Sequence, residues 1–182
     1  MQPWWHTVWL AIQAEFADIA DLREVTQILV RLLMAAVLGA VLGFEREHKG
    51  KSAGVRTHML VCLGAALFVL APSMAGADEQ ALSRVIQGIV AGIGFLGAGT
   101  ILKGNGQETS HVKGLTTAAG LWMTAAIGTA AGVGREATAV ISTVLALLVL
   151  GSMPLLVEKL EGEDEGKQAE EKEQKEEKGR KH

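Results

Sequence analysis

The sequence predicts an all-α membrane protein, a bundle of about five transmembrane helices with an N-terminal interfacial helix and a charged C-terminal tail. Three observations predict this class. Long stretches carry almost no charge, they lack the alternation of apolar and polar residues that strands show, and Ala, Leu and Gly outnumber aromatic residues within them. A helix of about 20 apolar residues crosses a hydrocarbon core of about 30 Å, and this composition favours helices over a membrane-spanning barrel.

The first 24 residues are expected to form an amphipathic helix at the membrane surface. One side of this helix would carry Trp4, Trp5, Trp9, Ile12 and Phe16, with the acidic residues of the segment elsewhere. Tryptophan concentrates where the membrane meets water, so the pattern predicts an interfacial helix within residues 1–24. A disordered or purely packing extension is the alternative.

The transmembrane domain is expected to cover residues 25–157. Its five apolar segments are 25–44, 57–75, 85–102, 115–133 and 137–157. Arg31 lies inside the first segment and Arg84 just ahead of the third. Each arginine is expected to extend its guanidinium group to the lipid headgroups, because a charge at mid-membrane costs about 2.5–3.5 kcal/mol.

Basic residues in the loops predict the orientation of the chain. The loops after the first and third segments hold four and two Lys or Arg residues, whereas the loops after the second and fourth hold one each. Because Lys and Arg accumulate in short cytoplasmic loops, the N-terminus is predicted outside and the C-terminus in the cytoplasm.

Charge is concentrated in the tail, residues 158–182, which we expect to be a disordered segment or a solvated helix. The tail holds ten acidic and seven basic residues, whereas the preceding 157 residues hold ten of each. This balance, without a basic stripe, gives no electrostatic footprint for nucleic acid, so no nucleic-acid partner is predicted.

Glycines are the strongest feature within the predicted spans. Three pairs are spaced four residues apart, a pattern that lets helix backbones approach closely in lipid, either within one bundle or between two copies. The third span is especially rich in glycine and could alternatively be broken, with unwound carbonyls that coordinate ions. The glycines assigned to helix packing are Gly39, Gly43, Gly88, Gly92, Gly94, Gly97, Gly99, Gly128 and Gly132.

A charged cluster comes after the first span and forms the candidate site for a ligand or partner. Glu45 and Glu47 would point about 200° apart on a helix, so they cannot chelate one ion from that helix alone. Magnesium needs one or two carboxylates and several waters, so a magnesium site would need groups from another segment. The candidate site consists of Glu45, Arg46, Glu47, Arg56, Thr57, His58 and Lys113.

The alternative is a structural ion-pair cluster at this end of the bundle. Glu45 and Glu47 would then be held by Arg56, Lys113, Lys103 or the positive ends of the helices that start on the cytoplasmic side. Catalytic signatures such as a nucleophile elbow, a Walker loop or HExxH are missing from the sequence, so an enzyme is not predicted. No cofactor is predicted, with Mg²⁺ as the one ion that the carboxylates could bind.

The chain from residue 31 to residue 150 resembles the MgtC/SapB family. The residues that carry the resemblance are Arg31-Leu32-Leu33, Leu38-Gly39, Gly43-Phe44-Glu45-Arg46-Glu47, Ala53-Gly54-Val55-Arg56-Thr57-His58, Gly92-Ile93-Gly94-Phe95-Leu96-Gly97-Ala98-Gly99, Val112-Lys113-Gly114-Leu115-Thr116-Thr117-Ala118-Ala119, Trp122, Ala125-Ala126-Ile127-Gly128 and Gly132. The resemblance implies a multi-pass protein of the bacterial inner membrane, linked in some members to growth in low magnesium and survival inside host cells. Some members are thought to regulate other membrane proteins, including the proton-driven ATP synthase. Members of the virulence type carry a C-terminal domain resembling an ACT fold, where this chain has its charged tail.

These observations favour two functions from different classes. The first is a magnesium-limitation or ion-homeostasis factor that binds or regulates membrane partners through the charged cluster and needs no pathway. The second is a transporter or channel for Mg²⁺ or another ion, which needs a hydrated route through the bundle. The expected partners are the lipid bilayer, a membrane protein and further copies of the chain.

Overall fold

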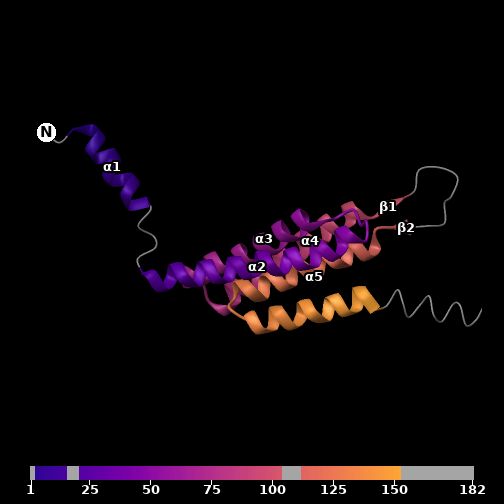
Figure 1. The fold of residues 1–182 in the computed structure, drawn as a ribbon. Coiled ribbons are helices and arrows are strands. Elements are labelled where there is room, and N and C mark those ends of the chain that lie inside the picture. Colours follow the sequence, from indigo (N-terminus) through magenta and orange to yellow (C-terminus); the bar gives the residue numbers. More distant parts are fainter. Residues whose placement is uncertain (1–2, 16–20, 104–111, 153–182) are drawn as a thin grey trace, which may run out of the picture. The chain divides into compact units, whose positions relative to one another are not determined.

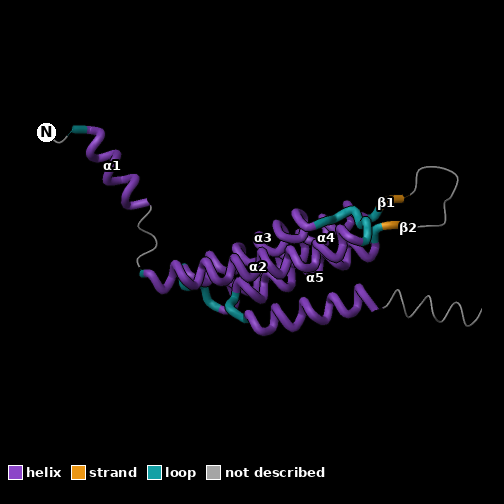
Figure 2. Tube along the Cα trace, in the orientation of Figure 1, coloured by secondary structure: helices purple, strands orange, loops and turns teal. Residues whose placement is uncertain are grey.

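The structure is a computed structural model that describes residues 3–15, 21–103 and 112–152. Apart from one pair of two-residue strands, the regular elements of this part of the chain are helices (Figures 1 and 2). The elements are α1 (Trp4–Glu15), α2 (Leu22–His48), α3 (Val55–Met74), α4 (Glu79–Thr100), β1 (Leu102–Lys103), β2 (Val112–Lys113), α5 (Leu115–Gly132) and an unlabelled helix, Glu136–Ser152. The prediction of an all-α membrane protein is confirmed.

The chain divides into two compact units, residues 1–141 and 142–182. The first unit contains α2 to α5, which run in alternating directions along a common axis (Figure 1). β1 and β2 come after α4 and before α5, and they pair antiparallel with Leu102 opposite Lys113. The described part of the second unit is the end of the helix Glu136–Ser152.

Acidic residues set the starts of two helices. The Asp21 carboxylate accepts a hydrogen bond from the backbone N of Arg23 at 3.2 Å, and that of Asp78 accepts one from Ala81 at 2.7 Å. Such caps satisfy backbone donors that have no partner within the helix. α5 instead begins after Gly114, whose φ of +99° and contact with the Thr100 carbonyl leave no room for a side chain. The starts of α2 and α4 are therefore set by local sequence.

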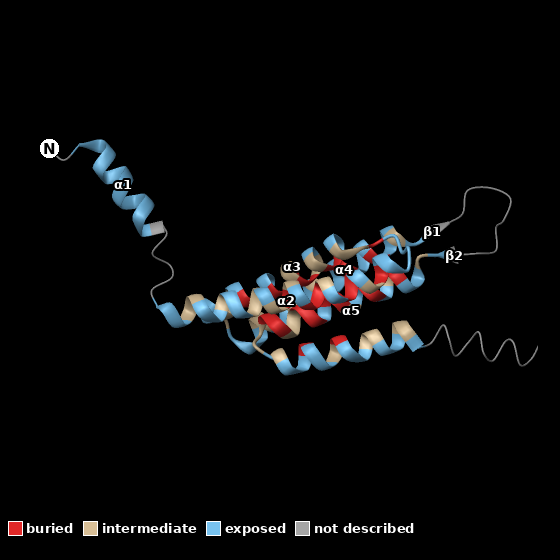
Figure 3. Cartoon of the chain, viewed as in Figure 1, coloured by how far each residue is buried: buried red, intermediate tan, exposed pale blue. Residues whose placement is uncertain are grey.

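α2, α3 and α5 pack closely because glycines remove side chains where the backbones meet. A Cβ on Gly39 would lie 2.8 Å from the carbonyl oxygen of His58, and one on Gly43 would lie 2.6 Å from Cα of Val55. Gly128 and Gly132 of α5 meet the backbone of α3 in the same way, at Cys62 and Ala66. Two glycine pairs, one on α2 and one on α5, thus hold both helices against α3, where the buried residues of Figure 3 concentrate.

α4 departs from the expectation that its glycines pack against other helices of the bundle. A Cβ on Gly88, Gly92, Gly94 or Gly99 would meet nothing within 4 Å, and only Gly97 contacts a neighbour, Ala118 of α5, among the described residues. α4 turns Ile93 and Gly97 to the interior instead. It is also a continuous helix through its glycine-rich stretch, so the alternative of a broken third span is not what the structure has.

Arg31 has partners within the chain, and its expected place at the lipid headgroups stays a prediction. Its Nη1 donates a hydrogen bond of 3.2 Å to the carbonyl oxygen of Gly132, and its Nε lies 3.9 Å from Oε1 of Glu136. Gly132 is the last residue of α5, where unpaired carbonyls and the negative end of the helix dipole attract a cation. The arginine therefore joins α2 to the end of α5.

Three described helices are long and apolar enough to cross a membrane: α2, α3 and α4. α5 matches the predicted segment 115–133 to within one residue, and with 18 residues it is shorter than these three and is not one of them. The helix Glu136–Ser152 is shorter still, and the rest of the predicted segment 137–157 lies outside the described residues. Five crossings therefore stay a prediction.

α1 is helical, as expected for residues 4–15, and its large apolar side chains are exposed. Trp4 is 75% exposed and packs edge-on to Trp5 with ring centroids 6.2 Å apart. Its location at the membrane surface stays a prediction, as do the boundaries 1–24, 25–157 and 158–182, and the charged tail lies outside the described residues.

Candidate functional site

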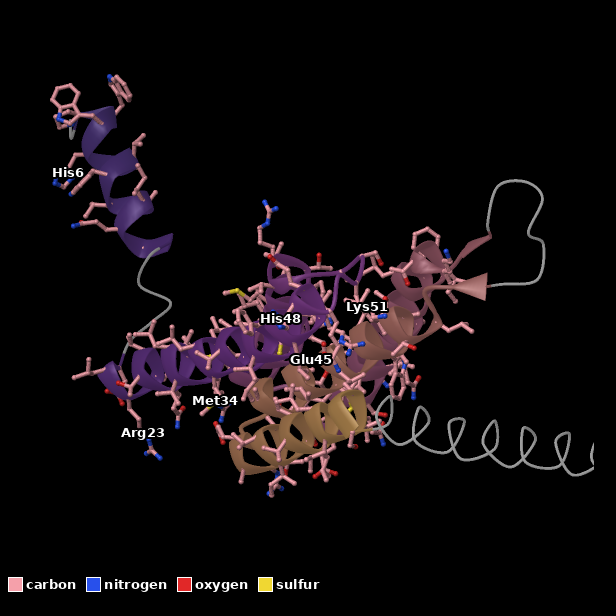
Figure 4. All side chains as sticks on the ribbon, turned by 45° about the vertical axis from the view of Figure 1, so that its right-hand side comes forward. His6, Arg23, Met34, Glu45, His48 and Lys51 are labelled. Carbon is pink, nitrogen blue, oxygen red and sulfur yellow. The ribbon has the colours of Figure 1, made fainter. Side chains whose placement is uncertain are left out.

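The candidate site lies where α2 ends and α3 and α5 begin. Alternating helix directions bring these three ends together, and Figure 4 shows Glu45, His48 and Lys51 in this region. The negative end of the α2 dipole thus lies beside the positive ends of α3 and α5. Acidic groups from α2 can therefore be stabilised by the neighbouring helix starts.

Glu45 lies between two cations of its own helix. Both Nε and Nη2 of Arg46 donate hydrogen bonds to its carboxylate, the second at 2.8 Å, and Nζ of Lys49 lies 2.7 Å from Oε1. The side chain of Arg46 is only 2% exposed, so this bidentate pairing offsets the cost of burying its charge. Among the described side chains, the partners of Glu45 are therefore Arg46 and Lys49, and neither Arg56 nor Lys113 forms an ion pair with it.

Glu47 caps the neighbouring helix. Its Oε2 accepts a hydrogen bond of 2.9 Å from the backbone N of Val55, the first residue of α3. The N-cap residue itself is Gly54, which has no side chain to do this, and a Cβ at Gly54 would collide with the Glu47 carboxylate. Glu47 is thus held by a helix N-terminus, which is one of the structural partners expected for the two glutamates.

His58 is buried in the middle of this helix contact, with 1% of its surface exposed. Its Nδ1 lies 3.0 Å from the carbonyl oxygen of Gly54. Its Nε2 is buried without a hydrogen-bond partner among the described residues and faces Gly120 of α5, where a Cβ would lie 3.7 Å away. Burying a ring nitrogen without a hydrogen bond costs free energy, and such atoms are rare. The Nε2 atom of His58 is therefore the one unsatisfied polar side-chain atom that the described residues bury in this site.

Two buried threonines of α5 share the helix face of Gly120. Thr117 and Thr124 are 3% and 0% exposed, and Oγ1 of Thr124 donates a hydrogen bond of 2.8 Å to the Gly120 carbonyl. Together with Arg46 and His58 they are the buried polar residues of the described helices α2, α3 and α5. Gly54, Gly120 and Lys49 were not among the predicted site residues, because their roles depend on which segment faces them.

The remaining predicted site residues are exposed. Arg56 and Thr57 lie in the first turn of α3, and Lys113 lies in β2 just before α5. Neither cation forms an ion pair with an acidic residue in the part of the chain described. Nearby on α2, Phe44 is 69% exposed and its ring stacks with that of His48. The site thus has an inner part that neutralises its own charges and an outer part that is basic and partly aromatic.

The residues described do not gather a metal site of the usual kind. No three His, Cys, Asp or Glu side chains within these ranges come together. Both glutamates already have partners from the chain, so an ion would have to displace Arg46 and Lys49 from Glu45, or the α3 backbone from Glu47, to bind either directly.

Comparisons with known proteins agree on one family. The model of the MgtC family matches residues 32–159. Protein SrpB of Synechococcus elongatus is 45% identical over 135 residues, which cover 69% of this chain and 74% of SrpB. The "Putative magnesium transporter YhiD" of Escherichia coli K12 is 40% identical over 131 residues, covering 68% of this chain and 59% of YhiD. Protein MgtC of Brucella abortus is 44% identical over 127 residues, covering 70% and 51%.

The chain therefore spans between about half and three quarters of the length of these relatives. No solved structure matches it. Because the family model covers well over half of the sequence, and the helices are those of a membrane protein, the chain belongs to the MgtC family.

Proposed function

We propose that this protein is an ion-homeostasis factor of the bacterial inner membrane that acts under magnesium limitation by binding and regulating a membrane-protein partner. The names of its relatives MgtC and YhiD support the link to magnesium. One observation carries the choice of mechanism: the two glutamates of the candidate site are occupied by donors of the same chain. The glutamates therefore stabilise the fold, and the exposed residues of the site, such as Arg56 and Lys113, are available to bind a partner.

The outer part of the site suits an acidic partner surface. Arg56 is exposed in the first turn of α3 and Lys113 is exposed just before α5, and the positive ends of the two helix dipoles add to their charge. The exposed Phe44 ring, near the end of α2, offers an apolar contact of the kind enriched in protein interfaces. With the orientation predicted from the basic loops, this surface faces the cytoplasm and the N-terminus lies outside.

Ion transport is the second candidate, supported by the name of the YhiD relative and by the carboxylates at the helix ends. Two features count against it. α4 is continuous where a broken helix was the expected source of ion-coordinating carbonyls, and the backbones of α2 and α5 lie directly on α3 at four glycines. A transporter would need these helices to separate during its cycle.

Magnesium flux into proteoliposomes tests the proposal. Vesicles with the purified chain are expected to take up Mg²⁺ no faster than empty vesicles across a wide range of concentrations. A protein-dependent flux that is lost in Arg56→Ala would overturn the regulatory mechanism in favour of transport. Cross-linking in the membrane then compares Arg56→Gln with Arg135→Gln, an exposed arginine in the loop at the other end of α5, and only the first is expected to lose its partner.

A further inference from the structure

A groove of about 660 Å³ runs between α3 and α4 and is separate from the charged cluster. We propose that it binds one acyl chain of an anionic phospholipid, whose headgroup phosphate is held by Arg84. The groove is defined by the lining residues of α3, from Leu60 to Phe68, those of α4, from Val85 to Leu96, and Ala125 of α5.

The groove exists because three of its lining positions are glycines. Gly64 of α3 and Gly88 and Gly92 of α4 all line it, and a Cβ at each would meet nothing within 4 Å. All the residues that line the groove are apolar. The volume is of the size that ligand sites have, about 300–1,000 Å³.

The groove lies open at the surface of two candidate membrane spans, which we expect to face the hydrocarbon. α3 and α4 are both candidate membrane spans, and the lining residues Leu60 and Phe68 are 70% and 65% exposed. An apolar trough on the lipid-facing side of two spans is in contact with acyl chains from the outset, so a chain entering it needs no polar group to be desolvated. This favours a lipid over a water-soluble ligand.

Arg84 supplies the charge complementarity. It lies one turn before Gly88, on the same side of α4 and next to Val85, which lines the end of the groove. It is exposed and forms no ion pair with an acidic residue in the described ranges. Side chains of a helix lean toward its N-terminus, which is the end of this span, so in a bilayer we expect the guanidinium group at the depth of a lipid phosphate and the acyl chain along Gly88 and Gly92.

Native mass spectrometry of the whole purified chain tests this proposal, with phosphatidylglycerol and phosphatidylcholine as probes. The wild type is expected to retain one phosphatidylglycerol per chain, in preference to phosphatidylcholine. Gly88→Leu/Gly92→Leu fills the groove and is expected to lower occupancy about tenfold. Gly94→Leu is the matched control, because Gly94 also faces open space but does not line the groove, and it is expected to bind as the wild type does.

The headgroup is tested separately. Arg84→Gln is expected to abolish the preference for phosphatidylglycerol, whereas Arg135→Gln retains it. Equal occupancy in the wild type and the filled variant would overturn the proposal. So would a wild-type dimer that the filled variant loses, since that result assigns the glycines of α4 to a second copy of the chain. Unfolding curves check each variant, and Gly88→Val replaces the double variant if it does not fold.

Discussion

The Glu47 carboxylate, at the end of α2, accepts a hydrogen bond from the backbone N of Val55, at the start of α3. A residue eight positions earlier in the chain thereby caps a helix whose own N-cap residue, Gly54, has no side chain to offer. The glycine makes this arrangement sterically accessible, because any Cβ there would collide with the carboxylate. The connection between α2 and α3 is thus stabilised by the Glu47 carboxylate, which the sequence predicts as part of a candidate ligand site.

Replacement of Glu47 tests this cap. Glu47→Ala is expected to lower the free energy of unfolding by about 1 kcal/mol, as loss of a helix cap does. Glu47→Gln keeps an acceptor oxygen and should lose less. Unfolding in a mild detergent measures both. Wild-type stability of Glu47→Ala, together with a loss of partner binding, would show a ligand role instead of a cap.

The glycines of α2 and α4 should respond in opposite ways to alanine. Gly43→Ala places a methyl group against the α3 backbone and is expected to destabilise by about 1–3 kcal/mol, the usual cost of overpacking. Gly94→Ala meets open space and is expected to be neutral or to stabilise by up to about 1 kcal/mol, since Ala is the better helix former. Thermal unfolding of the two variants in the same detergent measures this difference. Equal effects would mean that the close contact of α2 with α3 is not what requires glycine.

Arg31 links α2 to the end of α5, so its replacement should destabilise the last turn of α5. Arg31→Gln removes the cation from the Gly132 carbonyl and from Glu136, and is expected to cost about 1–3 kcal/mol. Arg23→Gln is the matched control, because Arg23 is exposed near the start of α2 and only its backbone N has a described hydrogen bond. Hydrogen exchange should show faster opening of the last turn of α5 in Arg31→Gln alone. Unchanged protection of that turn in Arg31→Gln would show that the arginine does not stabilise the end of α5.

The Arg46–Glu45 pair can be measured by a double-mutant cycle. Arg46→Met leaves Glu45 with Lys49 as its remaining described partner, and Glu45→Gln leaves the buried guanidinium with a neutral acceptor. Both single variants should be less stable than the wild type, and the double variant should lose less than the sum of their effects. The expected coupling energy is about 0.5–3 kcal/mol, as for residues in direct contact. Strict additivity would show that the pair does not act as a unit.

Much of the fold could be predicted from local patterns in the sequence. The predicted segment 115–133 corresponds to α5, Leu115–Gly132, because Gly114 and Gly134 with positive φ lie just before and just after an apolar run. The predicted start of α2, residue 25, is three residues late, since the Asp21 cap and the charged first turn resemble a flank of the span. The predicted start of α4, residue 85, is six residues late, more than one turn, because the helix begins at the Asp78 cap ahead of the apolar run.

The candidate site was predicted less completely. Its charged residues stand out in the sequence because charge beside an apolar span is conspicuous. Their partners do not: Glu45 pairs within its own helix, and Glu47 turns to the next one. Which of two neighbouring carboxylates faces which helix depends on the rotation of α2 about its axis, and that is fixed by contacts along the whole helix.

By itself, the sequence determined that the chain is a helical membrane protein and that α2, α4 and α5 each carry glycines four residues apart. Only the tertiary structure decided that the pairs on α2 and α5 lie against α3, while Gly88 and Gly92 of α4 border an open groove. The physical reason is that spacing is a property of a single helix and defines a stripe on it. A contact needs a second backbone opposite that stripe, and the position of that backbone is set by the packing of all the helices together.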